Sequence, residues 1–239
     1  MIKEEISLFH LIKLEQQKNK LGWFVKGAIL ATIFILVFSC LLPIMERNDG
    51  QQGINNTADY LMFIGAFVRG VFIVFAAVLI AKIIIEEFKN RTILVMFSYP
   101  INRKKILSAK LILIFCMTFI AMTISNIIVI IGFFGLNQIV HLTSVMNLTP
   151  ADFLAAIVKL ILFNLATAGA ALVPLYFGMI KYSTPATIVS SLLIVMVTSS
   201  SVGPNFSLAS IIYIPLGLAL IAFGIVASAI RKIDRIDVN

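Results

Sequence analysis

The sequence predicts an all-α integral membrane protein with six transmembrane helices. Apolar residues make up 60% of the 239 residues, charged residues only 13%, and the mean hydropathy is +1.05. Soluble domains are about 45–50% apolar and do not need so hydrophobic a composition. Long runs without charge alternate with short polar segments, as expected of a chain that crosses a bilayer repeatedly.

A helix needs about 20 mostly apolar residues to cross the hydrocarbon core, and six segments meet that requirement. They are predicted at about 24–45, 60–85, 107–131, 153–177, 184–201 and 207–229. The third is ended at 131 because FFGLNQ, at 133–138, interrupts the apolar run. The last two are separated by SSSVGPN, at 199–205, because residues 182–230 as one helix would measure roughly 70 Å. The loops are too short for a second folded unit, so residues 1–239 are predicted to form a single transmembrane domain.

Six crossings bring both termini to the same side of the membrane, and the basic residues identify that side. Sixteen of the 19 lysines and arginines fall in the terminal segments, in the loop after the second span or in the loop after the fourth, when the span edges that adjoin them are included. Because cytoplasmic loops carry the excess of Lys and Arg, both termini are predicted in the cytoplasm of a multi-pass plasma-membrane protein. The net charge of +8 is therefore a sign of topology rather than of nucleic-acid binding.

The segment before the first span predicts a helix that lies in the inner membrane interface, an elbow within residues 1–22. Ile2, Ile6, Phe9 and Ile12 fall on one broad helical side. Trp23 follows at the headgroup level, where aromatic side chains are enriched.

The sequence E-E-x-x-x-R at the end of the second span also opens the signature of the CAAX-type intramembrane proteases. Those enzymes require histidines in two further motifs. The chain has two histidines, His10 and His141, which the topology places on opposite sides of a bilayer about 30 Å thick. They cannot share a site with Glu86 and Glu87, so neither protease chemistry nor a metal site is expected.

A longer pattern between the second and third spans points elsewhere. In the order E…T…P…R…K stand Glu87, Thr92, Pro100, Arg103 and Lys110. This pattern resembles the first cytoplasmic loop of the ABC-2 family of transporter permeases, although Arg91 stands where that family usually has Gly. The resemblance extends to the chain length, the six spans and the basic segment that precedes them.

The resemblance implies that the loop contains a coupling helix that docks into a cleft of a separate ATP-binding subunit. Apolar side chains at helical spacing fit such an amphipathic helix, and Pro100 would end it. The residues expected to couple the chain to the ATPase are Glu87, Phe88, Thr92, Ile93, Met96, Phe97, Pro100 and Arg103. No G-x-x-x-x-G-K-[ST] motif occurs, so the chain itself is not expected to be an enzyme or to hold a cofactor. ATP and Mg²⁺ would belong to the partner subunit.

Two cations fall inside predicted spans, Arg69 in the second and Lys159 in the fourth. Intramembrane cations are costly and normally face a protein interior or water, so both are candidates for lining a translocation path. The alternative is that their side chains extend to the outer surface, which is easier for Lys159 than for Arg69. Small residues of the fourth span, such as Gly169, predict close helix packing, and Pro174 predicts a kink or a helix end.

The predicted function is that of the permease subunit of an ABC exporter in a bacterium. It would work with a second permease chain, identical or paralogous, and with two ATP-binding subunits. A hydrophobic or amphipathic cargo is expected, first a peptide such as a bacteriocin, toxin or other antimicrobial peptide, or a drug, and second a lipid-linked glycan. One alternative, an ATP-independent transporter or channel, would be expected to have acidic residues deep within spans, and none of the eleven is so placed. The other alternative is a membrane anchor that transports nothing.

Overall fold

The computed structural model describes residues 8–18, 22–48, 57–90, 103–140, 150–199 and 213–232, and the all-α prediction is confirmed for them. These residues form helices joined by short turns, and no strand occurs among them. The helices are α1 (Leu8–Lys18), α2 (Gly22–Asn48), α3 (Thr57–Ile80), the π-helix η1 (Ala81–Ile85), α4 (Glu86–Lys89), α6 (Arg103–Val140), α7 (Pro150–Ala170), α8 (Pro174–Lys181), α9 (Thr184–Ser199) and α10 (Tyr213–Lys232).

Five helical segments in the described part of the chain are long and apolar enough to cross a membrane. They are Gly22–Leu41, Leu61–Lys89, Lys104–Asn137, Ile157–Ile180 and Tyr213–Arg231. The predicted fifth span corresponds to α9, which has only 16 residues. At 1.5 Å per residue α9 measures about 24 Å, somewhat less than the hydrocarbon core of a bilayer.

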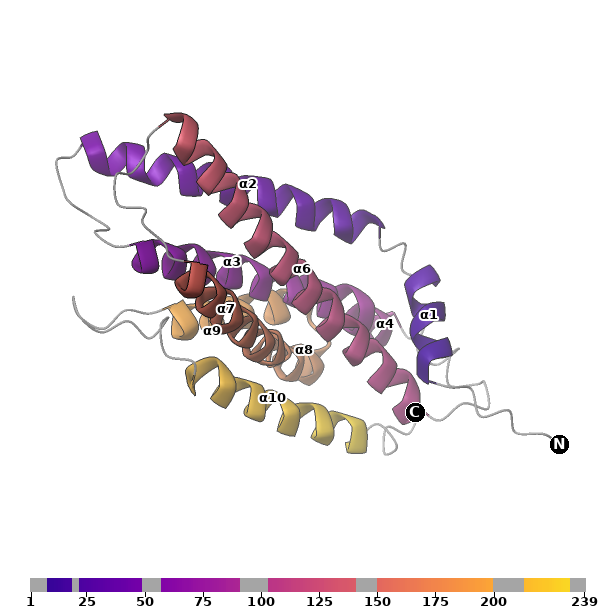
Figure 1. The fold of residues 1–239 in the computed structure, drawn as a ribbon. Helices are drawn as coiled ribbons and strands as arrows, with labels where there is room; N and C mark the ends of the chain where they lie inside the picture. The colour runs from indigo at the N-terminus through magenta and orange to yellow at the C-terminus, as the bar shows by residue number, and fades with distance from the viewer. Residues whose placement is uncertain are drawn as a thin grey trace.

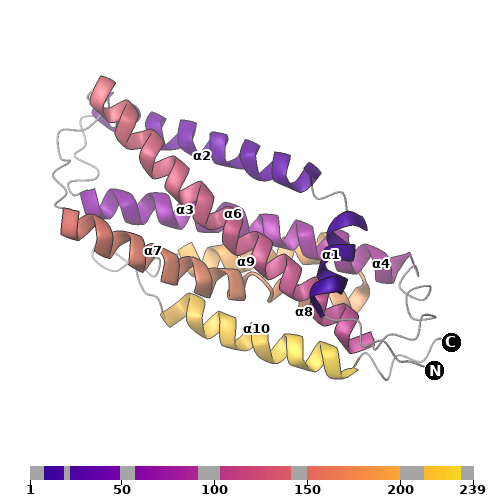
Figure 2. The same cartoon turned by 45° about the vertical axis from the view of Figure 1, so that its right-hand side comes forward.

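The long helices lie side by side and alternate in direction along the chain (Figures 1 and 2). Helix α1 runs across the bundle instead of along it, next to α4 and the beginning of α6. Helix α10 ends at this same end of the bundle, which we call the α1 end. Half of residues 1–22, predicted as an elbow, therefore form a single short transverse helix, whereas 1–7 and 19–21 lie outside the described residues and Gly22 begins α2.

The segment α3–η1–α4 is the central rod, because it contributes to all three clusters of buried apolar side chains. At the α1 end, Ile83 and Ile84 pack with residues of α6 such as Leu111. Further along, Phe72 packs with residues of α2 and α6, and Ile73 shares a cluster with residues of α9, of α10 and of the turn between α7 and α8. In contrast, α2 and α10 leave many large apolar side chains exposed, which suits contact with lipid or with another chain.

The break predicted at 133–138 is wrong, since α6 continues as one 38-residue helix to Val140. Phe133 is fully buried in the cluster that joins α6 to α2 and α3. A glycine such as Gly135 costs a helix interior only about 1 kcal/mol relative to alanine, which tertiary packing can offset. The short polar interruption therefore does not end the helix.

The predictions for the fourth span hold at two positions. Pro174 opens α8 after a turn whose amides bond three residues back, Leu172 N to Gly169 O at 3.1 Å and Val173 N to Ala170 O at 3.0 Å. The proline thus interrupts the α-helical bonding within this span. A Cβ on Gly169 would lie 2.8 Å from the Cβ of Ala219 in α10, so the absent side chain permits the close approach of α7 and α10.

Candidate functional site

The second span changes its helical winding just before its acidic end. Residues Ala81–Ile85 form a π-helix, and Glu86 and Glu87 follow directly in α4. A π-turn holds one more residue than an α-turn, so it shifts the facing of the residues after it by about 100°. The two carboxylates have different surroundings as a result. Glu86 pairs with Lys82 at 2.7 Å on the half-exposed side of the rod, whereas Glu87 is only 8% exposed and faces the bundle.

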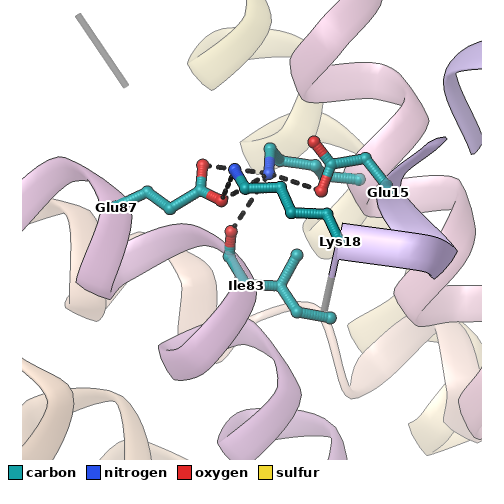
Figure 3. A network of polar contacts seen from close by, with 5 residues as sticks. Glu15, Lys18, Ile83 and Glu87 are labelled. Atoms are coloured by element: carbon teal, nitrogen blue, oxygen red, sulfur yellow. Dashed lines mark hydrogen bonds and ion pairs between the residues drawn. The ribbon is translucent and has the colours of Figure 1, made fainter. Parts of the chain in front are cut away.

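Lys110 of α6 lies at the centre of a buried group of charges, bonded to Glu15, Glu87 and the Ile83 carbonyl, which Figure 3 labels. Its Nζ lies 2.9 Å from Glu87 Oε2 and 2.9 Å from Glu15 Oε2, and it donates to the Ile83 carbonyl oxygen at 3.4 Å. The Lys110 side chain is 0% exposed. The Nζ of Lys18 lies 2.7 Å from Glu87 Oε1, and the Lys18 side chain is 48% exposed. We call Glu15, Lys18, Glu87 and Lys110 the charge cluster.

The formal charges of the cluster balance, with two lysines and two glutamates. A buried ammonium is tolerated only where carboxylates and carbonyls replace its hydration, and Lys110 has both. Such a group contributes little net stability compared with apolar packing, but the loss of one partner typically costs about 3–5 kcal/mol. The cluster therefore favours one relative placement of the segments that it joins.

Those segments are far apart in the sequence. Glu15 and Lys18 belong to α1, Glu87 to the end of the second span, and Lys110 to the beginning of α6. The loop at 91–102, predicted to contain the coupling helix, lies between the last two. Glu87 precedes the loop by four residues, and Lys110 follows it by eight. The charge cluster therefore joins the two helices that flank this loop and connects both to α1.

The end of α4 makes a second contact, with the turn between α8 and α9. The ring of Phe88 stacks on the ring of Tyr182, with centroids 5.5 Å apart and planes 12° from parallel. This contact brings a predicted coupling residue against a turn that the sequence did not associate with coupling.

The structure gives the two intramembrane cations different surroundings. Arg69 is 9% exposed, and its guanidinium carbon lies 4.8 Å from the ring centroid of Phe163 in α7, within the range of a cation–π interaction. Gly65, one turn earlier, leaves room for this group, because a Cβ there would lie 3.1 Å from a guanidinium nitrogen of Arg69. Lys159 is exposed on α7.

A pair of buried amides was not anticipated from the sequence. Asn126 of α6 donates through Nδ2 to Oδ1 of Asn164 in α7 at 3.1 Å, and both side chains are fully buried. Among the described residues, Asn126 Oδ1 and Asn164 Nδ2 have no hydrogen-bond partner. A useful sign in the sequence was the presence of a single amide in the middle of each of two apolar spans.

The predicted coupling residues are thus described only in part. Glu87 and Phe88 make the contacts above, and Arg103 is the first residue of α6. The other predicted coupling residues lie outside the described residues: Thr92, Ile93, Met96, Phe97 and Pro100. The contacts of Lys18 with Glu87 and of Glu15 with Lys110 were not predicted from the sequence. The sign available was that Leu11, Glu15 and Lys18 recur at spacings of four and three, which places an acid on the side of α1 that Leu11 buries.

Comparison with known proteins agrees with the pattern in the loop. The sequence matches the family described as "ABC-2 family transporter protein" over residues 11–199, a range that includes the whole charge cluster. It is also similar to a protein of Bacillus subtilis (strain 168) named "Uncharacterized protein YcbO". The two are 47% identical over 230 residues, which cover 95% of this chain and 99% of that protein. No solved structure matches the chain significantly.

Proposed function

This chain belongs to the ABC-2 transporter family, and from that membership we propose that it is the membrane-spanning permease subunit of an ATP-driven exporter. It would form the translocation path, while a separate ATP-binding subunit would hold ATP and Mg²⁺ and supply the energy. The absence of a P-loop motif in the sequence supports this division of labour.

In the proposed topology the chain crosses the plasma membrane six times, with α9 as the short fifth span. The α1 end of the bundle would lie on the cytoplasmic side. Helix α2 begins and α10 ends at the α1 end, which supports an even number of crossings. The distribution of charge supports the orientation, because the basic residues at the ends of helices there include Lys18, Lys26, Lys104, Lys105 and Arg231. A crossing by α9 would require the bilayer to thin locally by a few Å, at modest cost.

The observation that carries the proposal is the charge cluster. Closure of an ATP-binding subunit on the loop at 91–102 would push α4 and the beginning of α6. Because Lys110 is bonded to both Glu87 and Glu15, these helices and α1 would move as one body. The surface that docks on the subunit would comprise the other residues expected from the sequence, Phe88, Thr92, Ile93, Met96, Phe97, Pro100 and Arg103. Glu87, which is buried, would act by holding α4 to α6 through Lys110.

We propose an assembly of two permease chains and a broad class of cargo. The exposed apolar faces of α2 and α10 leave room for a second permease chain, identical or paralogous, besides lipid. The family and the apolar bundle favour a hydrophobic or amphipathic cargo, such as an antimicrobial peptide or a drug. Arg69, placed on the Phe163 ring, would meet a polar or anionic group of that cargo as the helices separate.

Affinity purification of the full-length chain from its native membrane tests the proposal. An ATP-binding subunit should purify with it, and that association should fall when Phe97 or Arg103 is replaced by glutamate. Ile131→Ala, on an exposed position far along α6, and Arg231→Ala, a basic position on α10, serve as controls that should retain the subunit. Transport by the purified chain alone would favour the ATP-independent transporter instead.

A further inference from the structure

The turn between α8 and α9 has an unusual backbone at Tyr182. This residue has φ 47° and ψ 42°, and within the described residues no other non-glycine residue has a positive φ. The left-handed conformation is unfavourable for a residue with a Cβ, and glycine is the usual choice at the end of a helix. The presence of a tyrosine therefore requires a reason beyond the turn itself.

The aromatic ring provides that reason, because it stacks on Phe88. The centroids are 5.5 Å apart, and the offset stacking of nearly parallel rings is a favourable aromatic contact. Phe88 lies in the last turn of α4, three residues before the loop at 91–102. Tyr182 is thus the residue through which the α8–α9 turn touches the segment nearest the loop.

The turn is fixed firmly to the helix that follows it. Ser183 N donates to Gly178 O at 3.2 Å, and Ser183 O accepts from both Thr187 N at 3.2 Å and Thr187 Oγ1 at 3.1 Å. Gly178 lies so close to its neighbours that a Cβ there would clash with Thr187 Oγ1 and lie 2.8 Å from Ile85 Cδ1. A displacement of Tyr182 would therefore move the first turn of α9, because the α8–α9 turn between them is too tightly bonded to deform.

We propose that Tyr182 is a positioning residue that carries motion of the loop at 91–102, through Phe88, to α9. This inference rests on the proposed function, since it requires an ATP-binding subunit that moves the loop. Glu87 and Phe88 are neighbours on α4 but contact different helices. One displacement of α4 would thus act on α1 and α6 through the charge cluster and on α9 through the stacked rings.

Hydrogen exchange of the full-length complex with its ATP-binding subunit tests the inference. Exchange is compared with and without Mg-ATP plus orthovanadate, which traps the closed subunit. In the unsubstituted complex, trapping should change the exchange of residues 91–102 and of the first turns of α9, residues 184–190. In Tyr182→Gly the change at 91–102 should remain while that at 184–190 falls at least about threefold, within the range of coupling energies for residues in contact. Tyr182→Phe, which keeps the ring, should behave like the unsubstituted chain.

The unfolding temperature of the complex separates a positioning role from a merely structural one. If Tyr182 only stabilised the turn, Tyr182→Gly would lower the unfolding temperature. Under the inference this temperature should stay nearly unchanged, because glycine suits the left-handed backbone. Phe88→Leu should likewise lower the change at 184–190, and combining it with Tyr182→Gly should lower that change no further. An undiminished response at 184–190 in Tyr182→Gly overturns the inference, as does an unresponsive α9 in the unsubstituted complex. If 91–102 itself fails to respond there, the proposed function fails, and the inference fails with it.

Discussion

The ammonium nitrogen of Lys110 lies 2.9 Å from a carboxylate oxygen of Glu87, although 23 positions separate the two residues in the sequence. They are the first and last members of the E…T…P…R…K pattern that identifies the loop between the second and third spans. The two ends of the pattern are therefore in direct contact inside the bundle. With Glu15 they connect the transverse helix α1 to both helices that flank the loop.

Loss of the Lys110 charge should destabilise the protein far more than loss of an exposed lysine. In Lys110→Met, two buried carboxylates lose their shared cation, and we expect a loss of about 3–5 kcal/mol in the free energy of unfolding. Lys82→Met is the matched control, because Lys82 pairs with Glu86 on the half-exposed side and should cost at most about 1 kcal/mol. Thermal unfolding of the two variants in detergent measures the difference. Equal losses would contradict the burial of the cluster.

Reversal of one ion pair should fail to restore the protein. In the double variant Glu87→Lys and Lys110→Glu, the new carboxylate faces Glu15 and the new ammonium faces Lys18, so two like-charge contacts replace two favourable ones. Adding Glu15→Lys and Lys18→Glu makes every contact complementary again and should recover part of the folded yield. If the double reversal alone recovers the folded yield, Glu87 and Lys110 act as an isolated ion pair, and Glu15 and Lys18 do not interact with them significantly.

The buried amides should respond differently to single and double replacement. Asn126→Leu or Asn164→Leu alone leaves one buried amide without its hydrogen bond, which costs about 1–3 kcal/mol. The double leucine variant removes both polar groups and should be nearly as stable as the original chain, provided that the added volume fits. A double-mutant cycle of unfolding temperatures provides the measurement. Simple additivity of the two losses would show that the hydrogen bond does not couple α6 to α7.

A methyl group at Gly169 should force α7 away from α10. Gly169→Ala places a Cβ 2.8 Å from Ala219 Cβ, and such crowding costs typically about 1–3 kcal/mol. Gly217→Ala on α10 is the control, because a Cβ at Gly217 meets nothing within 4 Å. Combining Gly169→Ala with Ala219→Gly should recover the loss, as unfolding in detergent would reveal. No recovery would indicate that the crowding lies elsewhere.

Arg69 should matter for transport and Lys159 should not. Arg69→Leu keeps the bulk but removes the cation over Phe163, so ATP-driven uptake of a lipophilic dye or a labelled hydrophobic peptide into inverted vesicles should fall several-fold. The exposed Lys159, replaced by alanine, should leave uptake unchanged at equal protein level. Normal uptake by Arg69→Leu would remove Arg69 from the proposed path.

Hydropathy predicted the helical class and the approximate position of the long spans, because the length of an apolar run is a local property of the sequence. It failed at 133–138, where the burial of Phe133 against other helices outweighs one glycine. It also could not supply the contact between Glu87 and Lys110. That contact depends on the rotation of two packed helices about their axes, and the π-helix at Ala81–Ile85 changes the rotation of one of them. A charge count treats Glu86 and Glu87 alike, whereas the structure leaves Glu86 partly exposed and buries Glu87.

The central claim is that the loop at 91–102 faces the cytoplasm and receives force from an ATP-binding subunit. Phe97→Cys, in a chain whose Cys40 and Cys116 are replaced, allows a photoactivatable maleimide to be attached at that position in native membranes. Cross-linking to an ATP-binding subunit is expected, with a yield that changes when Mg-ATP and orthovanadate trap the subunit. Labelling of this cysteine from outside intact cells by a membrane-impermeant maleimide, with no subunit cross-linked, would contradict the claim.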